Sequence, residues 1–164
     1  MNIDLHIHTS KSDGVLTPKE VIDEAKKNNV SVISICDHDT IEAYDDTLLK
    51  YAKKNNVKLI YGVEISTKYK GYGYHVLGYN IDIFNEEFKK ELSKIRLARH
   101  NYLYEVSKKL NELGYIVNTN ELDKIDSVTK AHIANDIINN EKNRDLLIKN
   151  FNCIPNKGEF IETL

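Results

Sequence analysis

The chain has 164 residues, a formal net charge of −2 at pH 7 and 41% hydrophobic residues, which suits one soluble domain with a packed core. No long basic run occurs, so the composition offers no electrostatic basis for binding duplex nucleic acid. There is no signal segment, no apolar stretch that would span a membrane and no C-x-x-C pair, so we expect a reduced, cytoplasmic protein without membrane contact.

The first eighty residues alternate between predicted strands and helices. A helix is expected from Pro18, with Thr17 as its N-cap, and a second one within residues 37–56, with Thr40 as its cap. The expected strands cover residues 2–8, 30–36, 57–66 and 74–81. Such alternation is typical of a parallel α/β sheet or barrel.

The second half of the chain changes character after residue 84. Apolar residues at spacings of three and four predict one long helix over residues 86–115, which Gly114 would end. Shorter helices are expected at residues 120–125, 130–140 and 143–151, and residues 153–164 either begin another short helix or end without one. This half is therefore predicted to be entirely helical.

Polar side chains occur at the ends of the predicted strands, at positions that are usually apolar in a buried sheet. Asp4, His6 and His8 alternate, so they share one strand face with a backbone spacing of roughly 7 Å. Two imidazoles at that spacing can bind one metal ion, although a pair of surface histidines is an equally good interpretation of these residues alone.

Three further clusters favour the metal interpretation. His38 lies between Asp37 and Asp39, Glu64 lies inside an apolar strand, and His75 begins the next strand. In parallel α/β folds the strand ends converge on one site. Mixed imidazole and carboxylate ligands suit zinc, manganese or iron, and more than four ligands suggest more than one ion. For Asp39, capping of the following helix is the preferred interpretation.

The motifs "DLHIHTSKSDG", "ICDHDT", "GVEIS" and "HVLGY" together resemble the PHP (polymerase and histidinol phosphatase) domain. The resemblance implies an α/β fold, in which residues 1–84 form the N-terminal portion of a distorted (β/α)7 PHP barrel and residues 85–164 form an all-helical insertion subdomain. The later histidine and closing D-x-H of the family do not occur in the chain. We therefore expect it to be the N-terminal part of such a protein.

The resemblance also implies a site with two or three divalent ions, manganese first, with zinc, iron(II) or magnesium as alternatives. Asp4 and Asp37 would accept hydrogen bonds from ligating imidazoles. The implied metal ligands are His6, His8, Asp13, His38, Glu64 and His75.

The activity implied is that of a metal-dependent phosphoesterase, which hydrolyses nucleotides such as nucleoside 3′,5′-bisphosphates, or short oligonucleotides, through a metal-activated water. "KIRLAR" resembles the arginine-bearing helix of the family's insertion, so Arg96 and Arg99 are expected to contact a substrate phosphate. "KAHIAND" makes His132 a third expected substrate contact, although Thr129 and Lys130 stand where the family has arginine and proline.

Several alternatives remain open at this point. Without the resemblance, a solvated helix face is the better interpretation of the two arginines. Histidinol-phosphate hydrolysis is a second enzymatic hypothesis, against which the arginine-bearing insertion argues. A non-catalytic metal-binding or interaction module is a third hypothesis. An exposed edge of the sheet would also favour a homo-oligomer.

Overall fold

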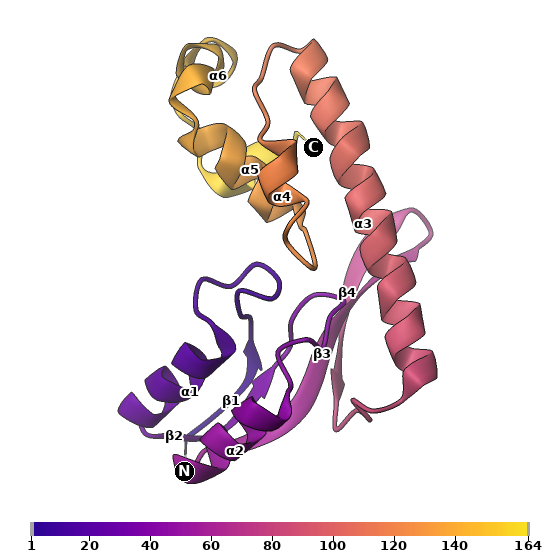
Figure 1. Ribbon diagram of the computed structural model, residues 1–164. Helices are drawn as coiled ribbons and strands as arrows, with labels where there is room; N and C mark the ends of the chain where they lie inside the picture. Colours follow the sequence, from indigo (N-terminus) through magenta and orange to yellow (C-terminus); the bar gives the residue numbers. More distant parts are fainter. Residues whose placement is uncertain (1, 164) are drawn as a thin grey trace. The chain divides into compact units, whose positions relative to one another are not determined.

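The computed structural model describes residues 2–163 and divides them into two compact units, one ending at Arg96 and the other beginning at Leu97. The division falls within the long helix α3 (Glu86–Glu112) (Figure 1). The predicted domain boundary at residues 84/85 stays a prediction.

The first unit is built on a four-stranded mixed sheet, ordered β1-β2-β3-β4. The first three strands run parallel, and β4 pairs antiparallel with β3 through a tight turn at Lys70 and Gly71, which both have positive φ. The strands are β1 (Asn2–Ile7), β2 (Val30–Ile35), β3 (Lys58–Tyr69) and β4 (Tyr72–Tyr79). The predicted α/β class is confirmed.

The helix α1 (Pro18–Lys27) begins as the sequence predicts. Thr17 and Glu20 form a capping box, in which each side chain accepts a hydrogen bond from the backbone N–H of the other residue. Three apolar side chains of this helix are buried, at Val21, Ile22 and Ala25.

The helix α2 (Asp46–Lys54) begins later than predicted, and its cap is Asp45. The prediction that Thr40 caps this helix is wrong, and so is the capping role preferred for Asp39. The chain after β2 is held along the sheet, because Asp39 N–H donates to the Glu64 carbonyl at 2.9 Å and Glu64 N–H donates to the Asp37 carbonyl at 3.2 Å. These bonds tie residues 37–39 to β3, and Asp39 takes a left-handed conformation with a φ of 54°, so the helix begins only after Asp45.

A hydrophobic core joins α1 and α2 to one face of the sheet. Ile33 and Ile35 of β2 contribute to it, and both are fully buried. The opposite face of β2 is also buried, because Ser34 and Cys36, the residue after the strand, are fully covered. At the edge of the sheet, Ile3 and Leu5 of β1 are exposed. Oligomerisation through this edge stays a prediction.

The second unit is helical, as predicted. Its core has an apolar centre that includes Leu103, Ile133, Ile137 and Leu147. Gly114 follows α3 with a φ of 92°, a left-handed conformation that suits a helix stop. The shorter helices are α4 (Thr119–Leu122), α5 (Lys130–Asn139), η1 (Glu141–Asn143), α6 (Arg144–Phe151) and α7 (Lys157–Ile161).

No helix within residues 2–163 is both long enough and apolar enough to cross a membrane.

Candidate metal centre

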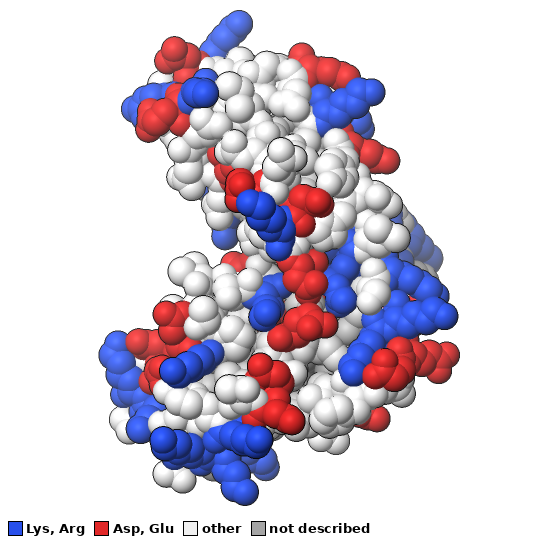
Figure 2. Space-filling view, viewed as in Figure 1, with Lys and Arg blue, Asp and Glu red and all other residues white. Residues whose placement is uncertain are grey.

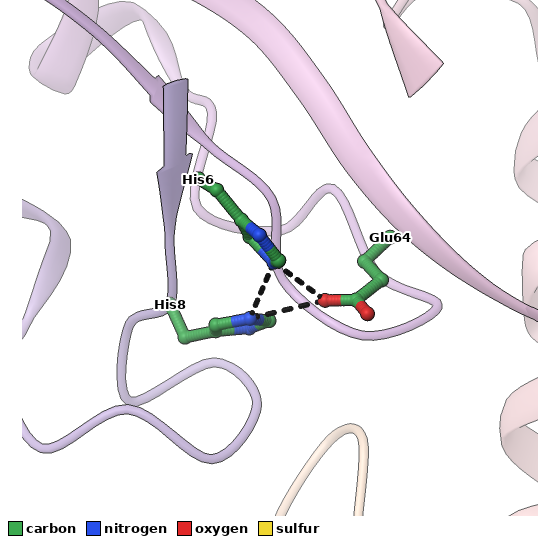
Figure 3. A group of neighbouring side chains, drawn as sticks. All are labelled: His6, His8 and Glu64. Carbon is green, nitrogen blue, oxygen red and sulfur yellow. Dashed lines mark hydrogen bonds and ion pairs between the residues drawn. The ribbon is translucent and has the colours of Figure 1, made fainter. Parts of the chain in front are cut away.

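Two histidines and one glutamate converge at the end of β1. His6 Nε2 and His8 Nε2 lie 3.1 Å apart, and each lies close to Glu64 Oε2, at 2.9 Å and 3.0 Å. Figure 3 shows the three side chains pointing toward one another, two from the end of β1 and one from β3. The alternation that the sequence predicts for His6 and His8 thus brings both imidazoles to one carboxylate oxygen.

The second oxygen of the same carboxylate faces β4. His75 Nδ1 lies 2.8 Å from Glu64 Oε1. In the antiparallel ladder, His75 pairs with Ser66, two residues along β3 from Glu64, so both side chains project from the same face. The hairpin therefore brings His75 to Glu64 from the neighbouring strand.

Asp13 and His38 form a second part of the cluster. The Asp13 carboxylate lies 3.6 Å from His8 Nδ1 and 3.6 Å from His38 Nε2, through different oxygens. His38 Nδ1 lies 3.8 Å from Glu64 Oε2, so His38 stands between the two carboxylates. The next residue, Gly14, approaches the backbone so closely that a Cβ there would lie 2.3 Å from the His8 carbonyl oxygen. Only glycine allows this approach.

The six side chains form three overlapping donor groups. In each group, the donor atoms lie within 4.8 Å of one another, and His8, His38 and Glu64 each belong to two groups. The groups are His6–His8–Glu64, His8–Asp13–His38 and His38–Glu64–His75. Every residue expected from the sequence as a metal ligand therefore lies in one continuous cluster.

The environment of Glu64 favours its ionised form. The side chain is only 6% exposed, and burial alone would raise the pKa of its carboxyl. The hydrogen bond with His6 and the neighbouring imidazoles outweigh burial and hold the pKa of Glu64 below its usual value. Glu64 therefore carries the negative charge that cation binding requires.

Asp37 supports the loop that follows β1. Its carboxylate accepts hydrogen bonds from Thr9 N–H at 2.7 Å, Thr9 Oγ1 at 2.6 Å and Ser12 Oγ at 2.6 Å. Ser12 Oγ in turn lies 3.5 Å from His8 Nδ1. Asp37 therefore reaches the cluster through two hydroxyl residues, Thr9 and Ser12, which are not among the residues predicted for the site. The only sequence signal for Thr9 and Ser12 is that they lie in the polar turn between His8 and Asp13.

The other expected supporting residue, Asp4, lies on exposed β1. Its Oδ1 accepts a hydrogen bond from the backbone N–H of His6 at 3.3 Å. Asp39, which was predicted to cap a helix, is fully buried and accepts a hydrogen bond from Ser66 N–H at 2.7 Å. It joins the loop of His38 to β3.

The three expected substrate contacts lie along α3 and α5. In the first unit, Arg96 Nη1 donates to the carbonyl of Asp39 at 3.4 Å. In the second unit, Arg99 Nη1 donates to the carbonyl of Val128 at 3.0 Å. His132 Nδ1 accepts from Thr129 N–H at 3.0 Å in a capping box at the start of α5. Their role with substrate stays a prediction.

The sequence matches the family model named PHP domain over residues 4–163. The chain belongs to the PHP domain family. The donor set fits the metal ions that this membership implies, because imidazole and carboxylate groups from separate elements converge within bonding reach of common points.

Relatives of this PHP chain include an exoribonuclease and a nucleoside bisphosphate phosphatase. It is 38% identical over 134 residues to a 5′-3′ exoribonuclease of Haemophilus influenzae, covering 80% of this chain and 48% of the relative. It is 26% identical over 149 residues to a 3′,5′-nucleoside bisphosphate phosphatase of Chromobacterium violaceum, covering 88% of this chain and 52% of the relative.

A solved structure supports the fold. A protein described as an amidohydrolase from Chromobacterium violaceum matches with a TM-score of 0.78 at 24% identity, covering 91% of this chain and 54% of its own. This match shows a shared fold. The chain spans about half the length of the curated relatives it matches.

Proposed function

We propose that this chain carries the metal centre of a phosphoesterase that hydrolyses phosphate esters of nucleotides or short oligonucleotides. The observation that carries the proposal is the buried Glu64 carboxylate, which lies 3.0 Å or less from three imidazoles. The names of two relatives, an exoribonuclease and a nucleoside bisphosphate phosphatase, support this substrate class.

The three donor groups are the proposed metal sites, with manganese as the first expectation and zinc, iron(II) or magnesium as alternatives. Glu64 would be shared between two of the groups, since its two oxygens face different histidines. When bound, divalent ions supply Lewis acidity, which activates water and neutralises charge on a phosphate group.

The chain's own residues position these groups and shape the surroundings. Asp37 holds the loop of Thr9 and Ser12 beside His8 through three hydrogen bonds. Arg96, which donates to the Asp39 carbonyl, places a guanidinium group next to the loop that carries His38. A guanidinium binds phosphate oxygens through two parallel N–H bonds, so Arg96 is the proposed phosphate contact of the first unit.

Hydrolysis of a nucleoside 3′,5′-bisphosphate tests the proposal. We expect phosphate release by the purified chain with manganese, and none after chelation. The Glu64→Gln variant should lose this activity, whereas Glu24→Gln, which alters an exposed acid paired with Lys27 on α1, should keep it. Metal binding without hydrolysis of either a bisphosphate or a short oligonucleotide would favour the non-catalytic alternative.

A further inference from the structure

A groove of about 510 Å³ lies between α1 and α2, outside the donor cluster. Its apolar lining comes from the start of α1, the loop before α2 and the body of α2. These apolar lining residues are Pro18, Ala43, Leu48 and Tyr51. Four lysines also line it: Lys11, Lys19, Lys50 and Lys54.

The charge of this groove is positive. None of the four lysines forms an ion pair within residues 2–163, and Lys19 Nζ lies 4.9 Å from the centre of the Tyr51 ring. The lining also contains two acids, Glu42 and Asp45, but the Asp45 carboxylate already accepts the Leu48 N–H at 2.6 Å as the cap of α2. Figure 2 shows basic side chains along this helical side of the first unit, with acidic side chains among them.

One loop joins the groove to the donor cluster. Lys11 lines the groove, whereas Asp13 lies 3.6 Å from both His8 and His38. Two residues of chain span at most roughly 7 Å. The loop is also fixed, because Ser12 N–H and Gly14 N–H both donate to the Thr9 carbonyl at 3.0 Å. The groove therefore opens within a short distance of the cluster.

We infer that this groove binds the nucleotides of a single-stranded oligonucleotide next to the end held at the metal centre. Apolar and aromatic side chains accept the faces of unpaired bases, and lysines neutralise the backbone phosphates. The inference deepens the proposed function and rests on it for the position of the cleaved end. It makes the groove a determinant of preference for oligonucleotides over mononucleotides.

Equilibrium binding tests this inference without relying on hydrolysis. The probe is a fluorescently labelled single-stranded pentaribonucleotide, measured by anisotropy in EDTA. We expect Lys19→Ala/Lys50→Ala to weaken binding by at least about fivefold. The slope of log K against log salt concentration should also become shallower by about 1.4, because two phosphate contacts are lost. Lys19→Arg/Lys50→Arg should bind like the wild type.

The matched control removes two lysines from the same helices outside the groove, Lys27→Ala/Lys53→Ala. Equal weakening in both alanine variants would overturn the inference, since it would reflect net charge alone, and so would unchanged binding in Lys19→Ala/Lys50→Ala. Circular dichroism verifies that each variant is folded. If the wild-type chain bound the oligonucleotide as expected but did not hydrolyse the bisphosphate, the result would instead count against the proposed function.

Discussion

The two units bury polar groups with different partners. In the first unit, the buried Glu64 carboxylate lies next to four histidines, which come from the end of β1, the segment after β2 and β4. In the second unit, the buried Asn143 side chain bonds, among the described residues 2–163, only to backbone groups. These are the Ile116 N–H, the Ile116 carbonyl and the Ile137 carbonyl, at 2.7–3.1 Å. An amide that completes backbone hydrogen bonds stabilises a fold, whereas a carboxylate surrounded by imidazoles is arranged for a ligand.

The first unit departs from an apolar core at one end of its sheet. Four imidazoles crowd at one end of the sheet, with ring centres of successive neighbours 4.7–5.0 Å apart. Apolar side chains at these places would pack a sheet more easily. The described part of the second unit buries no histidine, and its buried polar side chains are Ser107, Ser127, Thr129 and Asn143.

Among the variants that separate the two units, Glu64→Gln is expected to cause the largest change, a loss of manganese affinity. An outer partner of a metal ligand is worth 10–100-fold in affinity, so removal of a shared ligand should weaken manganese binding by more than about 100-fold. Isothermal titration with manganese measures this. Affinity within tenfold of the wild type would contradict the assignment of Glu64 as a shared ligand.

Asn143→Ala should affect stability and leave the metal centre unchanged. The loss of three bonds to backbone groups in a buried site is expected to lower the free energy of unfolding by about 3 kcal/mol. Urea denaturation followed by circular dichroism measures the change. If manganese affinity fell as well, the separation of roles between the two units would be wrong.

Asp37→Asn should produce a smaller effect at the metal centre. The amide keeps the shape of the side chain but cannot accept hydrogen bonds on both branches from Thr9 and Ser12. We expect manganese affinity to fall by about tenfold through the loosened loop beside His8. The control is Asp23→Asn, which alters an exposed acid bonded to Tyr51. An equal loss of manganese affinity in Asp23→Asn would contradict this explanation.

The sequence predicted much of the fold because its patterns are local. The uncharged β-branched run of β2 and the Thr17–Glu20 capping box of α1 mark their elements without help from distant contacts. The start of α2 depended on bonds between Asp39 and Glu64, which are far apart in the chain. No local signal at Thr40 reports such bonds.

The donor cluster was predictable for a similar reason, since polar residues at strand ends meet at one edge of a parallel sheet. His75 was predicted at the start of a strand, whereas it lies within β4 and reaches Glu64 because β4 runs antiparallel to β3. The supporting hydroxyls of Thr9 and Ser12 were missed, because such residues are common in turns and their partner, Asp37, lies 25 to 28 residues away.

Manganese titration of the wild type and of His8→Ala tests the central claim most directly, because His8 belongs to two of the three donor groups. The account predicts at least two manganese ions per wild-type chain and a loss of at least one of them in His8→Ala. A wild-type chain that binds no manganese, zinc or iron(II), or a His8→Ala chain with unchanged stoichiometry and affinity, would contradict it.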